Sequence, residues 1–283
     1  MHPLAATFLG SPSATMAIQP AYLITPLILL PILLRIAALI RKDYYFFLSL
    51  GPGGTPSTPS GYLRICLLRL IARKDVLVPP PALHNSSPFN PFFQSPNALP
   101  ARKGTRPKVA GIAPQRQVTQ KGGMANVEKL SAAMKLLAEK NPGTLSTGKS
   151  CFEKHSLALF LNKNGFAVAG ETGEVCNRAL TASDVVSEAS IAKGIRNATC
   201  GTPPEIAHLH GSECSLHLTL HPADAAVVIE RGWGERHPLA GRGNWVPKGF
   251  VLIYAPRNEA EVETVMEIVR AGGWWVGGIE LES

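Results

Sequence analysis

The most pronounced hydrophobic segment of the chain lies near its amino terminus. Residues 17–40 read AIQPAYLITPLILLPILLRIAALI and contain a single charge, Arg35. About 20 apolar residues suffice to cross a bilayer, and proline is tolerated in such a span. We therefore expect a short tail over residues 1–16 and one N-terminal transmembrane helix over residues 17–40.

A cleaved signal peptide is the alternative interpretation of this segment. No Lys or Arg precedes it, and no small-x-small cleavage site stands before RKDYYFF, so a membrane span is favoured. Basic residues follow the segment, at Arg41, Lys42, Arg64, Arg69, Arg73 and Lys74. Because positive charge collects on the cytosolic side of a span, we expect a single-pass protein with a cytosolic C-terminal domain.

Residues 41–102 combine a charged helical segment with a proline-rich one. Residues 61–78, GYLRICLLRLIARKDVLV, are too charged to span a membrane, and their arginines fall around the helix, so we expect a membrane-proximal helix. Residues 78–100 hold seven prolines and show neither a helical nor a strand period. They predict an irregular linker.

Periodic segments alternate along residues 103–283. Apolar residues recur at helical spacing over residues 124–140, and again after Asn258, where Glu261 completes a capping box. Apolar or alternating runs predict strands over residues 155–161, 205–210, 214–220 and 250–255, with a turn at 211–213 and a short helix over 222–231. This mixed order predicts an α+β domain: a small, mostly antiparallel sheet with flanking helices.

Composition narrows the partners of the chain. The net charge is +8, yet the basic residues form no compact block with interleaved aromatics, and many flank the hydrophobic amino-terminal region. This distribution favours a lipid bilayer as partner and disfavours nucleic acid. Five cysteines without a CxxC pair indicate neither a disulfide framework nor a thiolate zinc site, and fit a reducing compartment.

Histidines gather in EIAHLHGSECSLHLTL. Side chains alternate across a strand, so His208 and His210 share one face of theirs, and Ser215, His217 and Thr219 share one face of the next. An even-numbered turn would pair residue 208 with 217 and residue 210 with 215. The three imidazoles would then converge on one patch.

Such a patch has three readings. HxH with a third histidine resembles cupin-type metal spacing, although the carboxylate and glycine that accompany that spacing are absent. Imidazoles of near-neutral pKa can also remove a proton from an acidic enol or phenol without a metal. The structural alternative is half-buried sheet histidines bonded to Ser215 and Thr219.

Two further segments carry candidate chemistry. GWGERHPLAG, residues 232–241, reads as an irregular loop that places Trp233, Arg236 and His237 side by side, although Trp233 could instead fill the core. Arg257 in YAPRNEAE follows a buried strand, where it can meet an anionic or enolate oxygen or pair with a glutamate of the next helix.

These segments resemble the fungal luciferase family. The similarity runs in order through RKDYYFFLSLGP, GYLRICLLRL, GTRPKVAGIAPQRQVTQ, LSTGKSCFEKHSLALFL, EIAHLHGSECSLHLTL, GWGERHPLAG and YAPRNEAE, and covers most of the chain from Arg41 to about Arg270. It assigns residues 103–283 to a luciferase-like domain. His221 lies outside the family pattern.

The resemblance implies a membrane-bound oxygenase of the endomembrane system, such as the endoplasmic reticulum. It would add molecular oxygen to a pyrone such as 3-hydroxyhispidin, without flavin, nicotinamide or metal, and lose carbon dioxide, with light in luminous members. The protein would then supply a base and a dry aromatic pocket for this reaction. We expect the catalytic groups to be His208, His210, His217, His237 and Arg257, and the groups that bind the pyrone or polyketide-like substrate to be Trp233, Arg236, His155 and Tyr254.

Overall fold

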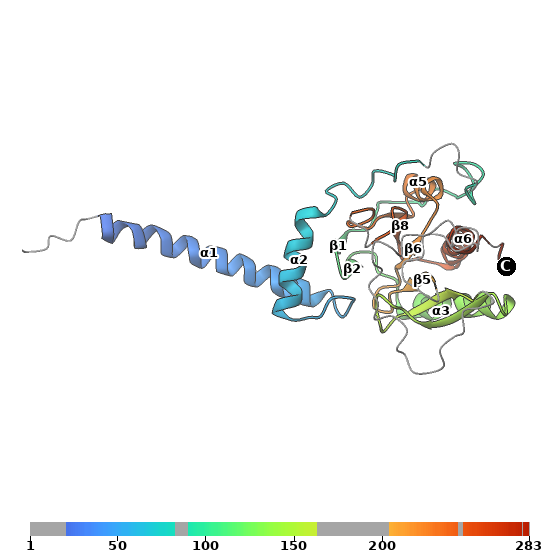
Figure 1. Cartoon of the computed structure of the whole chain (residues 1–283), viewed down its shortest axis with the longest axis horizontal. Coiled ribbons are helices and arrows are strands. Elements are labelled where there is room, and N and C mark those ends of the chain that lie inside the picture. Colours follow the sequence, from blue (N-terminus) through green and yellow to red (C-terminus); the bar gives the residue numbers. More distant parts are fainter. Residues whose placement is uncertain (1–20, 83–89, 163–203, 243–245, 279, 283) are drawn as a thin grey trace, which may run out of the picture. The chain divides into compact units, whose positions relative to one another are not determined.

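The computed structural model of the chain describes residues 21–82, 90–162, 204–242, 246–278 and 280–282 (Figure 1). By contact density the chain divides after Phe46 into two compact units, residues 1–46 and residues 47–283. The second unit contains every strand of the described part and the candidate site.

Helix α1, Ala21–Ser49, covers most of the predicted transmembrane segment. The prediction of a spanning helix over residues 17–40 is not supported, because no helix in the described part of the chain is long and apolar enough to cross a bilayer. From Leu29 onward, where its side chains are described, α1 carries Arg35 and the charged run Arg41-Lys42-Asp43. These charges interrupt the apolar stretch that a span requires.

Six strands of the described residues form one antiparallel sheet, in the order β3-β4-β5-β6-β8-β7. Their bounds are β3 Leu145–Lys149, β4 Leu157–Leu161, β5 Glu205–Leu209, β6 Leu216–Thr219, β7 Gly234–Arg236 and β8 Phe250–Ile253. A separate two-stranded ribbon pairs β1, Val109–Gly111, with β2, Gln115–Gln117. The predicted α+β class with a small antiparallel sheet is therefore confirmed.

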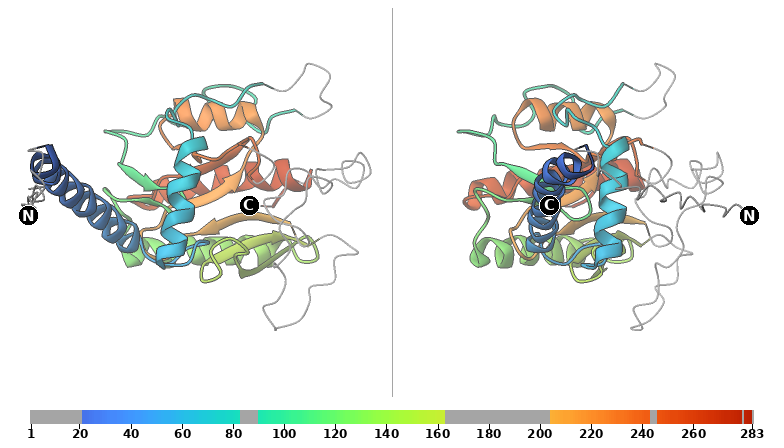
Figure 2. Two further views of the ribbon diagram at one scale, coloured as in Figure 1. Left: turned by 60° about the vertical axis from the view of Figure 1, so that its left-hand side comes forward. Right: turned by 90° about the vertical axis from the view of Figure 1, so that its left-hand side faces the viewer.

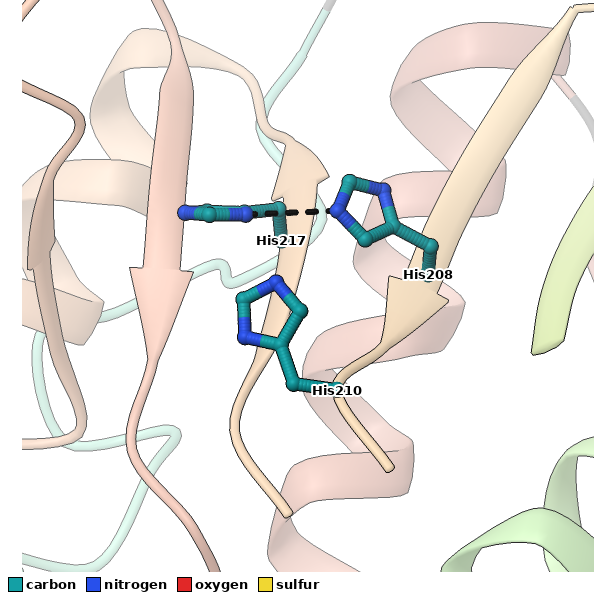
Figure 3. Close-up of side chains that lie close together, drawn as sticks. All are labelled: His208, His210 and His217. Carbon is teal, nitrogen blue, oxygen red and sulfur yellow. Dashed lines mark hydrogen bonds between the residues drawn. The ribbon is translucent and has the colours of Figure 1, made fainter. Parts of the chain in front are cut away.

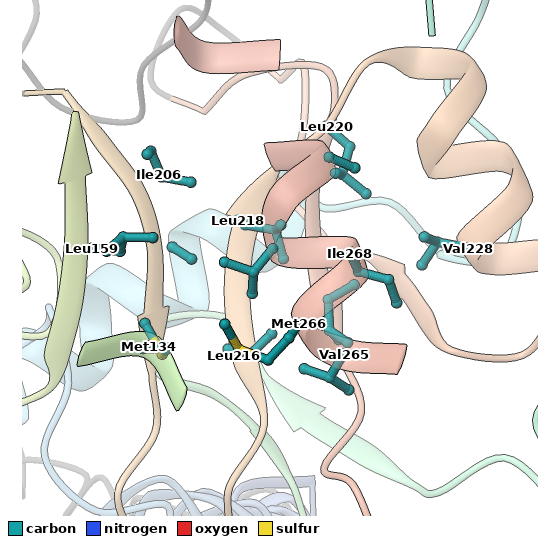
Figure 4. Close-up of a cluster of buried hydrophobic side chains, with 14 of the residues drawn as sticks. Met134, Leu159, Ile206, Leu216, Leu218, Leu220, Val228, Val265, Met266 and Ile268 are labelled. Atoms are coloured by element: carbon teal, nitrogen blue, oxygen red, sulfur yellow. The ribbon is translucent and has the colours of Figure 1, made fainter. Parts of the chain in front are cut away.

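The helices that build the core pack on one face of this sheet. α3, Met124–Lys140, contacts β3 and β4, and α6, Glu259–Gly277, contacts β4, β5 and β6. The further views in Figure 2 show both helices running alongside the strands. Leu216, Leu218 and Leu220 point into the apolar cluster that these helices close (Figure 4). Alternation then leaves His217 and Thr219 on the other face.

Local sequence signals set the helix ends. Asn258 caps α6 by accepting a hydrogen bond from the Glu261 N–H, and Gly278, in the left-handed conformation at φ 62°, ends it. α5, Pro222–Glu230, begins at proline, as predicted, and His221 caps it by accepting from the Ala223 N–H. His221 therefore has a structural role away from the histidine patch, with its ring against Trp275.

Two parts of the sequence-based picture differ from the structure. Residues 232–241 are not wholly irregular, because Gly234–Arg236 form the edge strand β7, paired with β8. A Cβ atom at Gly234 would lie 2.5 Å from the Leu252 carbonyl oxygen. The glycine that suggested a loop in the sequence therefore allows β7 to pair closely with β8. Among the described cysteines, Cys66 and Cys214 are free and Cys151 is disulfide-bonded, a bond that the cysteine spacing had not indicated.

Residues 59–100, which lie in the second unit, follow the predicted secondary structure more closely. The helix predicted over residues 61–78 is α2, Pro59–Ile71, which is capped by Thr58 and carries an exposed row of leucines, Leu63, Leu67 and Leu70. The described part of the proline-rich linker, residues 79–82 and 90–100, contains neither helix nor strand. Asp224 of α5 accepts hydrogen bonds from the N–H groups of Phe92 and Phe93 and so holds the linker against the domain.

Candidate functional site

Three histidines meet on the face of the sheet opposite the apolar core. His208 on β5 lies directly across from His217 on β6, as the strand alternation predicted, and the His210 N–H donates to the Ser215 carbonyl. The ring centroids are 5.3 Å apart for 208–210, 5.2 Å for 208–217 and 4.7 Å for 210–217. Figure 3 shows the three rings turned toward one another. Each residue is at most 4% exposed.

Each ring also has a partner on its outer side. His208 Nδ1 lies 2.6 Å from Glu205 Oε1, and His210 Nδ1 lies 3.0 Å from Glu213 Oε1. His217 Nε2 lies 2.9 Å from Gln115 Oε1. Carboxylate and amide oxygens only accept, so the outer nitrogen of each ring carries the proton that it donates. The inner nitrogen is then unprotonated in a neutral imidazole.

A bulge in β5 brings Glu205 to this side of the sheet. Ala158 pairs with His208 and Leu159 with Ala207, but the next residue, Phe160, pairs with Glu205, so β5 contains one extra residue at this point. In a regular strand Glu205 would share the core face with Ala207 and could not reach His208. The extra residue instead places the carboxylate beside the imidazole and sends Ile206 into the core.

An arginine–glutamate pair lies next to the cluster. Arg116 of β2 binds both carboxylate oxygens of Glu153, and Glu153 Oε1 lies 3.9 Å from His210 Nε2. Burial pushes the pKa of Glu153 upward, but the hydrogen bonds from Arg116 and the nearby imidazoles outweigh it and hold the pKa below its usual value. Glu153 is therefore an ionised carboxylate at neutral pH.

Burial has the opposite consequence for the imidazoles. It lowers the pKa of His210 well below its ordinary value, and the positive charge of Arg116 lowers it further. Burial likewise lowers the pKa of His217, with additional repulsion from the other histidines. Both rings are consequently neutral at pH 7 and present unprotonated nitrogens to the centre of the cluster.

Aromatic rings border the cluster. Phe250 of β8 stacks on His217 with centroids 5.0 Å apart, and Phe152 stacks on His208 at 6.2 Å. The two phenylalanines lie 5.9 Å from each other. These two rings give the cluster an aromatic border; whether the site excludes water stays a prediction.

His237 adjoins the cluster but has no nitrogen to offer. Its ring centroid lies 5.4 Å from that of His217. Its Nε2 donates to the Ile112 carbonyl, and its Nδ1 accepts from the Leu239 N–H. Burial lowers its pKa to about 4, so the ring is neutral and both of its nitrogens are already used. The assignment of His237 to catalysis stays a prediction.

The structure places the other predicted site residues in other contacts. The Arg257 guanidinium binds the Glu261 carboxylate, which is the ion-pair alternative. Trp233 lies in the core and donates its indole N–H to the Pro100 carbonyl. The Arg236 guanidinium is buried and donates to the Lys248 carbonyl. Tyr254 donates to Glu235, and His155 is exposed at the surface. Their assignment to catalysis or substrate binding stays a prediction.

Several residues of the site were not singled out from the sequence. Glu205 and Glu213 stand three residues before His208 and three after His210, a spacing that predicts no contact in a regular strand. Glu153 comes from the turn before β4, and Gln115 and Arg116 come from the β1–β2 ribbon. The only sequence signal for Glu153, Gln115 and Arg116 is that they lie in the motifs CFEKH and APQRQ, which resemble the family.

A shallow groove of about 490 Å³ lies elsewhere, between α6 and the linker. Its lining includes Leu99, Val262, Met266 and Arg270 and none of the site histidines. We place the functional site at the histidines because titratable groups converge there, whereas the groove offers mainly apolar walls with a few exposed charges.

The histidine cluster and the strands β5 to β8 fall within a recognised domain. Residues 204–272, from just before β5 into α6, match the Luciferase domain model. The cluster's three histidines all lie in this range, whereas Gln115, Arg116 and Glu153 lie before it.

Whole-chain comparison extends this result. The chain is 31% identical to the luciferase of Neonothopanus nambi over 237 residues, which cover 82% of this chain and 79% of the relative. It is 31% identical to the luciferase of Armillaria mellea and 30% identical to that of Armillaria gallica, each over 236 residues with the same coverage. The chain therefore belongs to the fungal luciferase family. No solved structure matches it.

Proposed function

We propose that this protein is an oxygenase that adds molecular oxygen to an acidic, electron-rich pyrone such as 3-hydroxyhispidin. The observation that carries the proposal is the convergence of three buried imidazoles, with unprotonated nitrogens turned inward, inside the luciferase domain. The relatives' names add that they are luciferases. Loss of carbon dioxide and emission of light are part of the proposal.

The chemistry proposed needs a proton acceptor first. Removing the enol proton gives an enolate that donates electrons to oxygen and forms a carbon–peroxide bond. The peroxide attacks the lactone carbonyl carbon and displaces the lactone ring oxygen, which leaves as an enolate and takes back the proton. Cleavage of the resulting four-membered peroxide ring releases carbon dioxide, so one atom of the molecular oxygen leaves in that gas and the other stays in the product. The inward nitrogens of His208, His210 and His217 are the proposed proton acceptors.

The carboxylates behind the rings fit that role. When an imidazole takes up a proton, an ionised carboxylate on its outer nitrogen stabilises the cation and holds the ring in orientation, as the Asp does in a catalytic triad. Glu205 and Glu213 stand in this position behind His208 and His210. Two of the three proposed bases therefore have an electrostatic partner.

Arg116 is the proposed partner of the enolate and peroxide oxygens. Two of its nitrogens bind Glu153, but its buried Nε has no hydrogen-bond partner among the described residues. An unpaired buried donor is costly, so an anionic oxygen of the substrate would be stabilised there. This assigns to Arg116 the role that the sequence suggested for Arg257.

Oxygen consumption with 3-hydroxyhispidin tests the proposal. We expect the full-length protein to consume oxygen and release carbon dioxide in equal amounts, with light recorded in parallel. His217→Asn should abolish turnover, and His221→Asn, a histidine outside the cluster, should retain it. Substrate binding by calorimetry without oxygen uptake would instead show a pure binding module, and oxygen uptake with another pyrone would change the substrate and keep the reaction.

Membrane attachment belongs to the same proposal. α1 exposes a run of large apolar side chains: Leu29, Leu30, Ile32, Leu33, Leu34, Ile36, Leu39 and Ile40. An exposed apolar helix surface of this kind favours burial in a lipid interface. We propose attachment to an endomembrane such as the endoplasmic reticulum, with the domain on the cytosolic face. Flotation with liposomes tests attachment, and protease protection of microsomes tests sidedness.

A metal-dependent reaction is the second candidate function. The observation that favours it is that one ring nitrogen from each of the three cluster histidines lies within 4.8 Å of the other two. Activity that is lost with a chelator and restored by one added metal would favour this candidate over the metal-free base that the sequence suggested.

A further inference from the structure

We propose that His208, His210 and His217 form a binding site for a divalent first-row transition-metal ion. The ligand atoms are Nε2 of His208, Nε2 of His210 and Nδ1 of His217. An ion held there would occupy the nitrogens named above as proton acceptors, so this inference deepens the second, metal-dependent candidate function and leaves Glu153 as the nearest proton acceptor. Its tests use no substrate, so they are decided separately from the reaction.

The first argument is the direction of the lone pairs. Each ring donates its proton outward, to Glu205, to Glu213 or to Gln115. The Gln115 amide has a fixed orientation, because its nitrogen donates to Glu235 and only its oxygen can face His217. The outer hydrogen bonds therefore hold the rings so that their inner nitrogens face the same point, where one cation could contact all three.

The second argument is an unpaired inner nitrogen. His210 Nε2 is buried and has no hydrogen-bond partner among the described residues. His208 Nε2 and His217 Nδ1 lie beside it, 3.3 Å from each other and within hydrogen-bond distance. Buried polar atoms are nearly always satisfied, so an unsatisfied nitrogen that points toward two others calls for a ligand.

The third argument is distance. Imidazole nitrogens bind zinc at about 2.0 to 2.1 Å, so two of them in a tetrahedral site lie roughly 3.3 Å apart. The separation of His208 Nε2 and His217 Nδ1 is 3.3 Å. One nitrogen from each of the three rings lies within 4.8 Å of the others, so His210 has to approach by a small side-chain movement.

The outer groups complete the pattern of a metal site. Metal-bound histidines usually donate their other nitrogen to a carboxylate or carbonyl, which fixes the ring, and all three do so here. Glu153 Oε1, 3.9 Å from His210 Nε2, is the nearest carboxylate oxygen for a fourth position or for accepting a proton from a substrate. Imidazole ligands suit zinc, iron, nickel and copper.

Metal analysis of the intact protein tests the proposal. Full-length protein purified in chelator-treated buffer would be titrated with Zn²⁺ or Co²⁺, dialysed and analysed by mass spectrometry. We expect about one ion per chain, and visible ligand-field absorption for Co²⁺ in a four-coordinate nitrogen-rich site. His210→Ala should lose the ion. His221→Asn, which changes a buried histidine outside the cluster, should bind as the wild type does.

An outer variant separates metal binding from folding. Glu213→Gln should weaken Zn²⁺ binding by roughly 10- to 100-fold in competition with a chromophoric chelator, with an unchanged circular dichroism spectrum. If His210→Ala does not fold, the change in Zn²⁺ affinity of Glu213→Gln tests whether the histidines bind the ion. Substoichiometric metal without Co²⁺ absorption, or equal binding by Glu213→Gln, overturns the proposal. Neither measurement uses a substrate, so oxygenase activity can fail while metal binding holds, and the reverse.

Discussion

Asp224 provides the prediction whose magnitude is best defined. Its side chain is fully buried on α5 and accepts hydrogen bonds from the N–H groups of Phe92 and Phe93, each at 2.9 Å. Burial raises its pKa from 3.8 to about 6, although the two hydrogen bonds oppose the rise. The folded protein therefore binds a proton at Asp224 more tightly than the unfolded chain does.

The sign and size of the pH effect follow from this shift. A carboxyl group with a raised folded-state pKa stabilises the protein at low pH, and this contribution is lost as the pH rises through the interval from 3.8 to about 6. Between about pH 4.5 and pH 7.5 the loss amounts to about 2 kcal/mol of unfolding free energy. Asp224→Asn has no titrating group and lacks this contribution.

Urea denaturation of both proteins across this pH range measures the effect. Other titrating groups are shared, so they cancel in the difference between the wild type and Asp224→Asn. We expect the advantage of the wild type to shrink by about 2 kcal/mol as the pH rises from about 4.5 to 7.5. A difference that stays constant, or that grows with pH, would refute the reasoning about burial.

Three further substitutions separate the site from its scaffold. Glu153→Gln leaves Arg116 buried without its counter-charge, so we expect a loss of about 3 to 5 kcal/mol in urea denaturation and slower oxygen uptake; unchanged stability would contradict the ion pair. Leu218→Ala opens a cavity beneath α6 and should cost about 2 to 5 kcal/mol in the same assay, while Zn²⁺ affinity stays within error. His221→Asn keeps a good helix cap, so oxygen uptake should match the wild type and the melting temperature should fall only slightly; loss of activity would place His221 in the site.

Local periodicity predicted the parts of the fold that depend on neighbouring residues. Strand alternation gave the shared face of His208 and His217 and their direct pairing, because side-chain direction has a fixed period of two residues. Helical spacing and the Asn258 cap gave α3 and α6. These features need only a dozen residues of sequence.

Contacts between distant segments could not be predicted in this way. Gln115 reaches His217 across 102 positions, and Arg116 reaches Glu153 across 37. Side-chain chemistry alone also cannot separate a core residue from a site residue. The sequence allowed two interpretations of Trp233 and of Arg257, as a residue of the site or as a structural residue. In the structure the Trp233 indole N–H donates to the Pro100 carbonyl, and the Arg257 guanidinium binds the Glu261 carboxylate.

The membrane segment shows a related difficulty. Residues 17–40 are apolar enough to suggest a span, but α1 continues without a break to Ser49 and takes in Arg41, Lys42 and Asp43. The extent of an apolar run in the sequence does not show where the helix that contains it ends. The length of the helix, and therefore its charge content, is set by residues beyond the apolar run.

The extra residue in β5 has a consequence for how this family can change. Without the bulge, Glu205 would face the apolar core beside Ala207, where an unpaired carboxylate is strongly destabilising. With the bulge, an apolar residue at that position would leave His208 Nδ1 without its acceptor. The backbone irregularity and the carboxylate are therefore epistatic in this chain: each is harmful alone, so a change that removes one favours a change that removes the other.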